Sequence, residues 1–166
     1  PLTAGTAILG GAYIDVFGDV TMDSALLIAQ AIGGQGSVGG DADGGITQVV
    51  AWNDSSSDLT INGNLAMNSY SQGGGGAVGG DATGGYAGLG AIDASGSADP
   101  ASVRIGGTVS MFVAGQGGVG VATGGSGTGG RVEILADGGD LTVGGIQATA
   151  NGNGGGAAPE PPAAEA

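Results

Sequence analysis

The chain has 166 residues, of which 42 are glycine and only six are aromatic, so a thick globular core is not expected. Its formal net charge is −13, because the acidic residues are opposed only by Arg104 and Arg131. A surface with so few cations repels phosphate, which excludes nucleic acid as a partner and disfavours anionic membranes.

Cysteine is absent, and no run of 18 apolar residues occurs. The sequence therefore predicts neither a disulfide framework nor insertion into a membrane. The chain opens at Pro1 without an initiator Met or a basic leader, so we expect a mature or excised piece of a longer protein. An acidic, glycine-rich repeat without cysteine is what we expect of an extracellular or bacterial cell-surface protein.

An alternating apolar phrase begins at residues 14–22 (IDVFGDVTM) and returns at 59–67 (LTINGNLAM) and 103–111 (VRIGGTVSM). The central glycines are 45 and then 44 residues apart, and a degenerate copy at 141–145 follows 38 residues later. This return of the same residue types in phase predicts a folded repeat array and not a disordered chain.

Apolar residues occupy every second position of each phrase, which predicts a strand with one buried face and a bend at the central glycine. If successive copies stack about 4.8 Å apart, one interior column contains Val16, Ile61, Ile105 and Val143. The segment 22–32 (MDSALLIAQAI) lengthens the first repeat. It is interpreted either as an extra bulged strand or as a short helix.

Glycine-rich blocks follow the phrases at 33–45, 73–85 and 115–130. Gly84-Gly85 and Gly129-Gly130 are again 45 residues apart, so the blocks belong to the repeat and are not linkers. A second apolar column follows the blocks, and its members are Val49 and Ala51, Leu89 and Ala91, and Ile134 and Ala136. A repeat of this length has room for about two coils of a solenoid, taking a coil as roughly 20 to 25 residues.

The predicted fold class is all-β, a parallel β-helix (β-solenoid) with long glycine-rich loops. A single repeat domain is expected over 1–150, with repeats at approximately 12–57, 58–101, 102–140 and 141–150, the last being partial. Residues 151–166 are expected to form a Pro/Ala/Glu tail or linker. The alternative for the glycine blocks is a polyglycine-II-like bundle of extended segments, which favours glycine at every third position, whereas these glycine pairs are irregularly spaced.

Most residue types used in catalysis are missing. Without His, Cys or Lys there is no Ser/His or Cys/His nucleophile, no Schiff-base lysine and no phosphate loop. Asp41 and Asp43 flank Ala42 as a carboxylate pair, but no recognisable cleft or aromatic sugar platform accompanies them. We therefore expect a protein that is not an enzyme.

Asp41, Asp43 and Asp81 are the candidate metal ligands. Asp41 and Asp81 occupy equivalent places in the motif GGDA, where the third copy has Ser126. If these carboxylates stack, a shared calcium ion would relieve their repulsion, although solvated turn aspartates are the simpler interpretation. The sequence predicts no cofactor, and calcium is the one candidate ion.

The phrases GDVTM, GNLAM and GTVSM lead into blocks such as GGDADGG and GGDATGG. In this repeat style residues 12–150 resemble the glycine-rich repeat regions of bacterial surface proteins, the filamentous-haemagglutinin-like and autotransporter adhesins. The resemblance implies a right-handed parallel β-helix that is exported, is held at or shed from the cell surface, and serves adhesion, biofilm or filament building.

Three function hypotheses follow. The first is a structural extracellular module, the β-solenoid rod of an adhesin or of a self-assembling filament, whose partners are neighbouring repeats or copies of itself. The second is a surface module that binds carbohydrate or calcium without catalysis, with a host surface as its partner. A carbohydrate-active β-helix enzyme is the weakest reading because His and Lys are absent.

Overall fold

The computed structural model describes residues 4–7, 10–52, 57–94, 96 and 99–157. Within these residues it contains fifteen strands and no helix, and all strand-to-strand ladders are parallel. The strands, in chain order, are β1 (Gly11–Val16), β2 (Val20–Met22), β3 (Ala25–Ile32), β4 (Ala42–Asp43), β5 (Ile46–Trp52), β6 (Asp58–Ile61), β7 (Leu65–Gln72), β8 (Gly76–Val78), β9 (Ala82–Thr83), β10 (Tyr86–Ile92), β11 (Ser102–Gln116), β12 (Gly120–Thr123), β13 (Gly127–Thr128), β14 (Arg131–Asp137) and β15 (Asp140–Asn153). The predicted all-β solenoid is confirmed.

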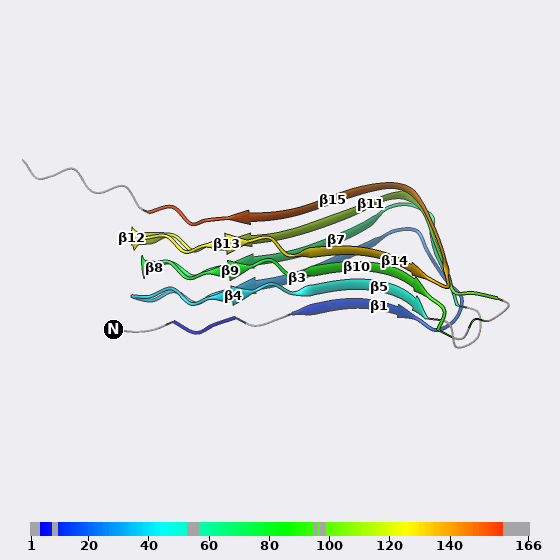
Figure 1. The fold of residues 1–166 in the computed structure, drawn as a ribbon, viewed down its shortest axis with the longest axis horizontal. Helices are drawn as coiled ribbons and strands as arrows, with labels where there is room; N and C mark the ends of the chain where they lie inside the picture. The colour runs from blue at the N-terminus through cyan, green and yellow to red at the C-terminus, as the bar shows by residue number, and fades with distance from the viewer. Residues whose placement is uncertain (1–3, 8–9, 53–56, 95, 97–98, 158–166) are drawn as a thin grey trace, which may run out of the picture.

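Two long sheets form the solenoid (Figure 1). The first has the order β1-β5-β10-β14, and the second joins β2, β3, β6, β7 and β11, with β15 paired to β11. The chain runs along the first sheet, turns a corner, returns along the second and reverses at the glycine-rich end (Figure 1). Each such circuit is one turn of the solenoid.

The repeat therefore corresponds to one coil, and the expectation of two coils per repeat is wrong. Backbone N–H groups of Ile46, Tyr86 and Arg131 donate to the carbonyls of Gly10, Gly45 and Gly85, one turn earlier. The glycines that precede these donors are Gly45, Gly85 and Gly130. Counted from Gly10, they mark three successive turns of 35, 40 and 45 residues. Each turn is about twice as long as the predicted coil, because it contains strands of both long sheets and a glycine-rich reversal.

The first predicted column is right in three of its four members. Ile61 pairs with Ile105, and Ile105 pairs with Val143. Val16, however, pairs with Ala51 in the first sheet, and the position equivalent to Ile61 in the first turn is Met22. Alternation reveals which face a residue occupies but not its rung, and only residues 17–19 separate β1 from β2.

The second predicted column is confirmed completely. Val49, Leu89 and Ile134 are register partners in β5, β10 and β14, and so are Ala51, Ala91 and Ala136.

Within 22–32 the chain forms a strand and not a helix, since β3 pairs with β7 along its whole length. The strand is neither extra nor bulged, because β7 is its counterpart in the next turn and the register is unbroken. The prediction that this segment lengthens the first repeat is wrong, since the first turn is the shortest. Leu27 and Ala29 point inward and are buried, while Leu26 and Ile28 are exposed. Apolar residues on both faces obscured the alternation.

The core tapers toward the glycine-rich end. Along β7 the inward residues are Leu65, Met67, Ser69 and Ser71, all fully buried, and Gly73 follows. The large side chains at the start of this series each contribute about 1.5–3 kcal/mol by burial. Because inward side-chain volume then falls to that of glycine, the two sheets converge. Their approach is visible where the Ser71 hydroxyl donates to the Thr83 carbonyl at 2.6 Å.

At the glycine-rich end, backbone hydrogen bonds replace side-chain packing. Each N–H donates to the carbonyl of the preceding member at 2.7–3.0 Å in the series Gly5, Gly34, Gly40, Gly74, Gly80, Gly118, Gly125 and Gly155. Successive members alternate between the segment that leaves the second sheet and the segment that leads into the first sheet. A Cβ on Gly74 or Gly118 would collide with a carbonyl oxygen of the turn below. We call this series the glycine ladder.

The glycine ladder joins the glycine blocks of successive turns, which confirms that the blocks belong to the repeat. The polyglycine-II-like alternative for these blocks stays a prediction. The glycine pairs are irregular along the chain but align between turns in three columns, which are 33–34 with 73–74 and 117–118, 39–40 with 79–80 and 124–125, and 44–45 with 84–85 and 129–130. β15 includes residues 151–153, which composition assigned to the tail, and residues 158–166 of that tail lie outside the described residues.

Candidate functional site

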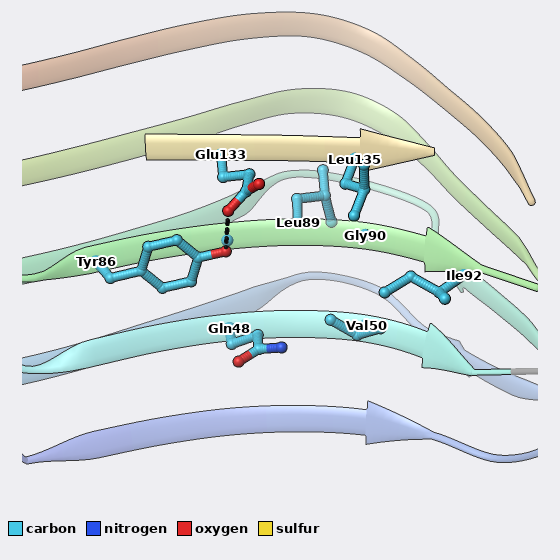
Figure 2. Close-up of a pocket in the computed structure, with 9 residues that line it drawn as sticks. Gln48, Val50, Tyr86, Leu89, Gly90, Ile92, Glu133 and Leu135 are labelled. Carbon is cyan, nitrogen blue, oxygen red and sulfur yellow. Dashed lines mark hydrogen bonds between the residues drawn. The ribbon is translucent and has the colours of Figure 1, made fainter. Parts of the chain in front are cut away.

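A depression lies on the outer face of the first sheet, over β10. The outward positions of this strand are Tyr86, Gly88, Gly90 and Ile92, so two neighbouring positions carry no side chain. Gln48 and Val50 of β5 flank the gap on one side, and Glu133 and Leu135 of β14 flank it on the other (Figure 2). The depression has a volume of about 70 Å³, and we refer to it as the β10 notch.

The two glycines of the β10 notch differ in the space that is available for a side chain. The Tyr86 ring lies over Gly88, so a Cβ there would strike the ring. A Cβ on Gly90 would meet nothing closer than 3.6 Å. Packing thus requires glycine at position 88 only. A strand glycine without a steric reason commonly marks a place that another molecule approaches.

A polar cluster closes one end of the β10 notch. The Tyr86 hydroxyl donates to Glu133 Oε2 at 2.9 Å (Figure 2), and Arg131 forms an ion pair with Glu133 Oε1 at 2.8 Å. The Arg131 guanidinium lies 5.9 Å from the centroid of the Tyr86 ring. Burial, followed by the hydrogen bond to Glu133 and its charge, raises the pKa of Tyr86, against an opposing effect of Arg131. The phenol therefore stays protonated at neutral pH.

Among the described residues that line the β10 notch, no nucleophile is paired with a base, because the titratable side chains there are a neutral phenol and a carboxylate held by Arg131. It offers apolar contact from Val50, Leu135 and Ile92, with hydrogen-bonding groups at the other end. Such a surface suits a small ligand with an apolar patch and hydroxyl groups. The sequence analysis followed the inward residues and did not predict the β10 notch. The pattern YAGLGAI, with glycine at two outward positions, was the signal that could have revealed it.

The predicted metal candidates lie near the glycine-rich end. Asp41 and Asp81 occupy the same place in successive turns, and Ser126 occupies it in the next. The Asp81 N–H donates to Asp41 Oδ1 at 2.8 Å, and the Ser126 N–H donates to Asp81 Oδ1 at 2.7 Å. Hydrogen bonds from Ser126, its backbone first, lower the pKa of the exposed Asp81, against a smaller opposing effect of desolvation. One oxygen of each carboxylate thus accepts a hydrogen bond from a backbone N–H of the next turn.

Asp43 lies beside Thr83 of the next turn and is exposed. In the described part of the chain, no three Asp or Glu side chains come close enough together to hold a metal ion. The structure therefore places Asp41 and Asp81 in one column but does not gather Asp41, Asp43 and Asp81 into a common site.

The two ends of the solenoid leave the core open. Eight apolar residues packed against the core are only partly buried: Ala12, Ile14, Met22 and Ala25 of the first turn, and Val132, Ile134, Leu141 and Val143 of the last. Their register partners in the middle turns, such as Leu59 and Val103 beside Leu141, are fully buried. Among the described residues, the apolar stripe thus continues up to both ends and no segment covers it.

No protein-family model, curated protein or solved structure matches this chain. Among the described residues there is no helix of the length and hydropathy needed to cross a membrane.

Proposed function

We propose that this chain is a structural module, a segment of a β-solenoid rod in a secreted or cell-surface protein of the adhesin or filament type, without catalytic activity. The observation that carries the proposal is the open core at both ends. A single copy has four strands in its first sheet, which at about 4.8 Å per strand gives a stack only about 20 Å high. A rod arises only when the stack continues beyond these turns.

The composition of the chain supports a structural role. With no His, Cys or Lys, the chain has no Ser/His or Cys/His pair and no Schiff-base lysine. The net charge of −13 keeps a repetitive surface soluble and repels other acidic surfaces. Repeat style and the absence of cysteine are the grounds for proposing an extracellular location.

A tandem fusion tests the rod proposal. Both described ends of the chain lie at the glycine-rich end of the solenoid (Figure 1), so four copies can be joined head to tail through the natural tail. We expect a single rod about 80 Å long by small-angle scattering and a higher melting temperature than that of one copy, because fewer core residues remain at open ends. Four independent beads that melt like a single copy would contradict the proposal.

A second candidate function, binding of a carbohydrate, is favoured by the β10 notch alone. Gly90 leaves room that packing does not need, and hydroxyl-binding groups stand at one end. Gly90→Val should fill the notch and abolish retention on a glycan array while leaving the melting temperature unchanged or raised. Equal retention of the variant and the natural chain would exclude the notch, and no retention of either would exclude carbohydrate binding.

A further inference from the structure

The partly buried residues at the two ends of the solenoid correspond to one another. Continuing the observed register by one strand places Ala12 and Ile14 of a second copy beside Val132 and Ile134 of the first. The same continuation in the second sheet places Val20 and Met22 beside Leu141 and Val143. Every half-buried apolar side chain at one end thus meets an apolar side chain at the other.

The corners of the end turns also match. In the middle turns, three residues separate the paired strand segments, between Ile61 and Leu65 and between Ile105 and Val109. In the first turn, only two residues separate Met22 from Ala25, and in the last turn only two separate Val143 from Ile146. The short last corner can therefore lie on the short first corner of another copy without a bulge.

The glycine ladder gives a third, independent correspondence. Its members alternate between the segment that leads into the first sheet, which holds Gly5, and the segment that leaves the second sheet, which holds Gly155. The ladder begins in one layer and ends in the other, so Gly5 of a second copy falls in the layer that must follow Gly155. The Gly155 carbonyl would then accept from that Gly5 N–H, as the Gly125 carbonyl accepts from Gly155 at 2.7 Å.

We propose that the last turn of one copy docks on the first turn of a second copy, with β14 pairing β1 and β15 pairing β2 and β3 in the register that operates inside the chain. The partner is thus a second copy of this chain, and the inference rests on the proposed rod function. Ile146, which is 50% exposed, becomes buried like its register partners Leu65 and Val109, which are fully buried.

The negative charge of the two end turns opposes this docking and makes it depend on the salt concentration. Near the joint lie Asp15, Asp19 and Asp23 of one copy and Glu133, Asp137 and Asp140 of the other, with Arg131 as the cation. Continuing the register sets Asp140 directly beside Asp19. Repulsion between exposed carboxylates weakens with salt, since the Debye length falls from about 30 Å at 0.01 M to about 3 Å at 1 M. Docking is therefore favoured by high salt.

Cysteine cross-linking tests the register, because the natural chain has no cysteine. The variants are Asp19→Cys and Ile28→Cys at the first turn, and Asp140→Cys and Thr149→Cys at the last turn, all at exposed positions. Matched mixtures are Asp19→Cys with Asp140→Cys, and Ile28→Cys with Thr149→Cys, whose positions fall in the same columns. Neighbouring strands hold such thiols at a separation that a disulfide spans.

Each mixture is oxidised with oxidised glutathione at about 0.01 M and about 1 M sodium chloride, and dimers are counted on a non-reducing gel. We expect matched mixtures at high salt to give on the order of 100-fold more mixed dimer than the swapped mixtures, Asp19→Cys with Thr149→Cys and Ile28→Cys with Asp140→Cys. Equal yields in matched and swapped mixtures, or no dimer at either salt, would overturn the proposed joint. The tandem fusion keeps the two proposals separate, since a single long fused rod with no cross-linking of free copies would retain the rod function alone.

Discussion

Two aspartates in this protein, Asp41 and Asp81, accept hydrogen bonds from the backbone of the next turn. Asp81 shows this most clearly, because the Ser126 N–H donates to its Oδ1 at 2.7 Å and lowers its pKa. Asn64 makes the same contact elsewhere, accepting from the Thr108 N–H at 2.8 Å. Side chains of this kind link turns at the surface, where the apolar core does not reach.

Replacing Asp81 should therefore reduce stability in a pH-dependent way. We expect Asp81→Ala to cost about 0.5–1 kcal/mol at pH 7, a value kept small because the site is open to water. The folded pKa lies below the ordinary value of 3.8, so the stabilisation from the charged form is present above that value and is lost as the pH falls through the lowered pKa. The difference between the natural chain and Asp81→Asn in urea unfolding should accordingly shrink between pH 7 and about pH 2.

Asp43→Ala is the matched control for Asp81→Ala, since the Asp43 side chain is exposed and makes no hydrogen bond among the described residues. It should leave the unfolding midpoint nearly unchanged. A difference between Asp81→Asn and the natural chain that stays constant with pH would contradict the assignment. So would a large gain in melting temperature on adding millimolar calcium, which the cation interpretation of Asp41, Asp43 and Asp81 predicts.

Two glycine substitutions distinguish a position where a side chain would clash from a position where it has room. Gly74→Ala should destabilise the protein by at least about 1–3 kcal/mol, because its Cβ would collide with the Gly34 carbonyl across the glycine ladder. Gly90→Ala, at a position with free space, should be neutral or stabilising by about 0.4–1 kcal/mol. Chemical denaturation of the two variants measures both values, and similar losses would show that the turns are not packed as closely as described.

At the scale of the strands, stability depends on the place of a residue in its column. Leu59 and Leu141 are the same residue type in one inward column, joined through Val103. Leu59 is fully buried, whereas Leu141 is only partly buried at the open end. We expect Leu59→Ala to cost about 2–5 kcal/mol and Leu141→Ala clearly less in the monomer, as measured by urea unfolding at low salt. Equal costs in the monomer would contradict the open end.

How much of each element could be predicted depends on whether a fixed marker lies nearby. The column of Val49, Leu89 and Ile134 follows a glycine pair at constant distance in every turn, so counting from that pair gave the correct register. The column of Ile61 lies beyond a corner whose length varies between turns, and counting by similarity misplaced Val16. Period two has no information about the rung, which only the backbone ladder supplies.

The candidate site was harder to predict than the core. Tyr86 and Glu133 are 47 residues apart in sequence and meet only because β10 pairs with β14. The pattern YAGLGAI places Gly88 and Gly90 at outward positions, but only the structure shows that a Cβ has room at Gly90. The equivalence of Asp41 and Asp81 was visible, by contrast, because the motif around them repeats, but their backbone partners could not be inferred from residue types.

At the scale of the whole molecule, the chain combines two kinds of interior. Near the corner, stacked Leu, Ile, Val and Met side chains form an apolar core. Toward the reversal, inward side chains shrink until the backbones of the two layers hydrogen-bond directly. This taper explains how a chain with few large apolar residues and 42 glycines remains one continuous solenoid, because buried backbone groups in the glycine blocks are paired and not left to water.

Hydrogen exchange, read by NMR for each amide, tests this continuity most directly. The N–H groups of Gly74, Gly80 and Gly118, which donate across the glycine ladder at 2.8–2.9 Å, should exchange as slowly as those of Ile61 and Val109 in the core strands, because both open only when the solenoid unfolds. Exchange of these glycine amides at the rate of an unstructured chain, while the core strands remain protected, would show that the glycine blocks are loops outside the rod.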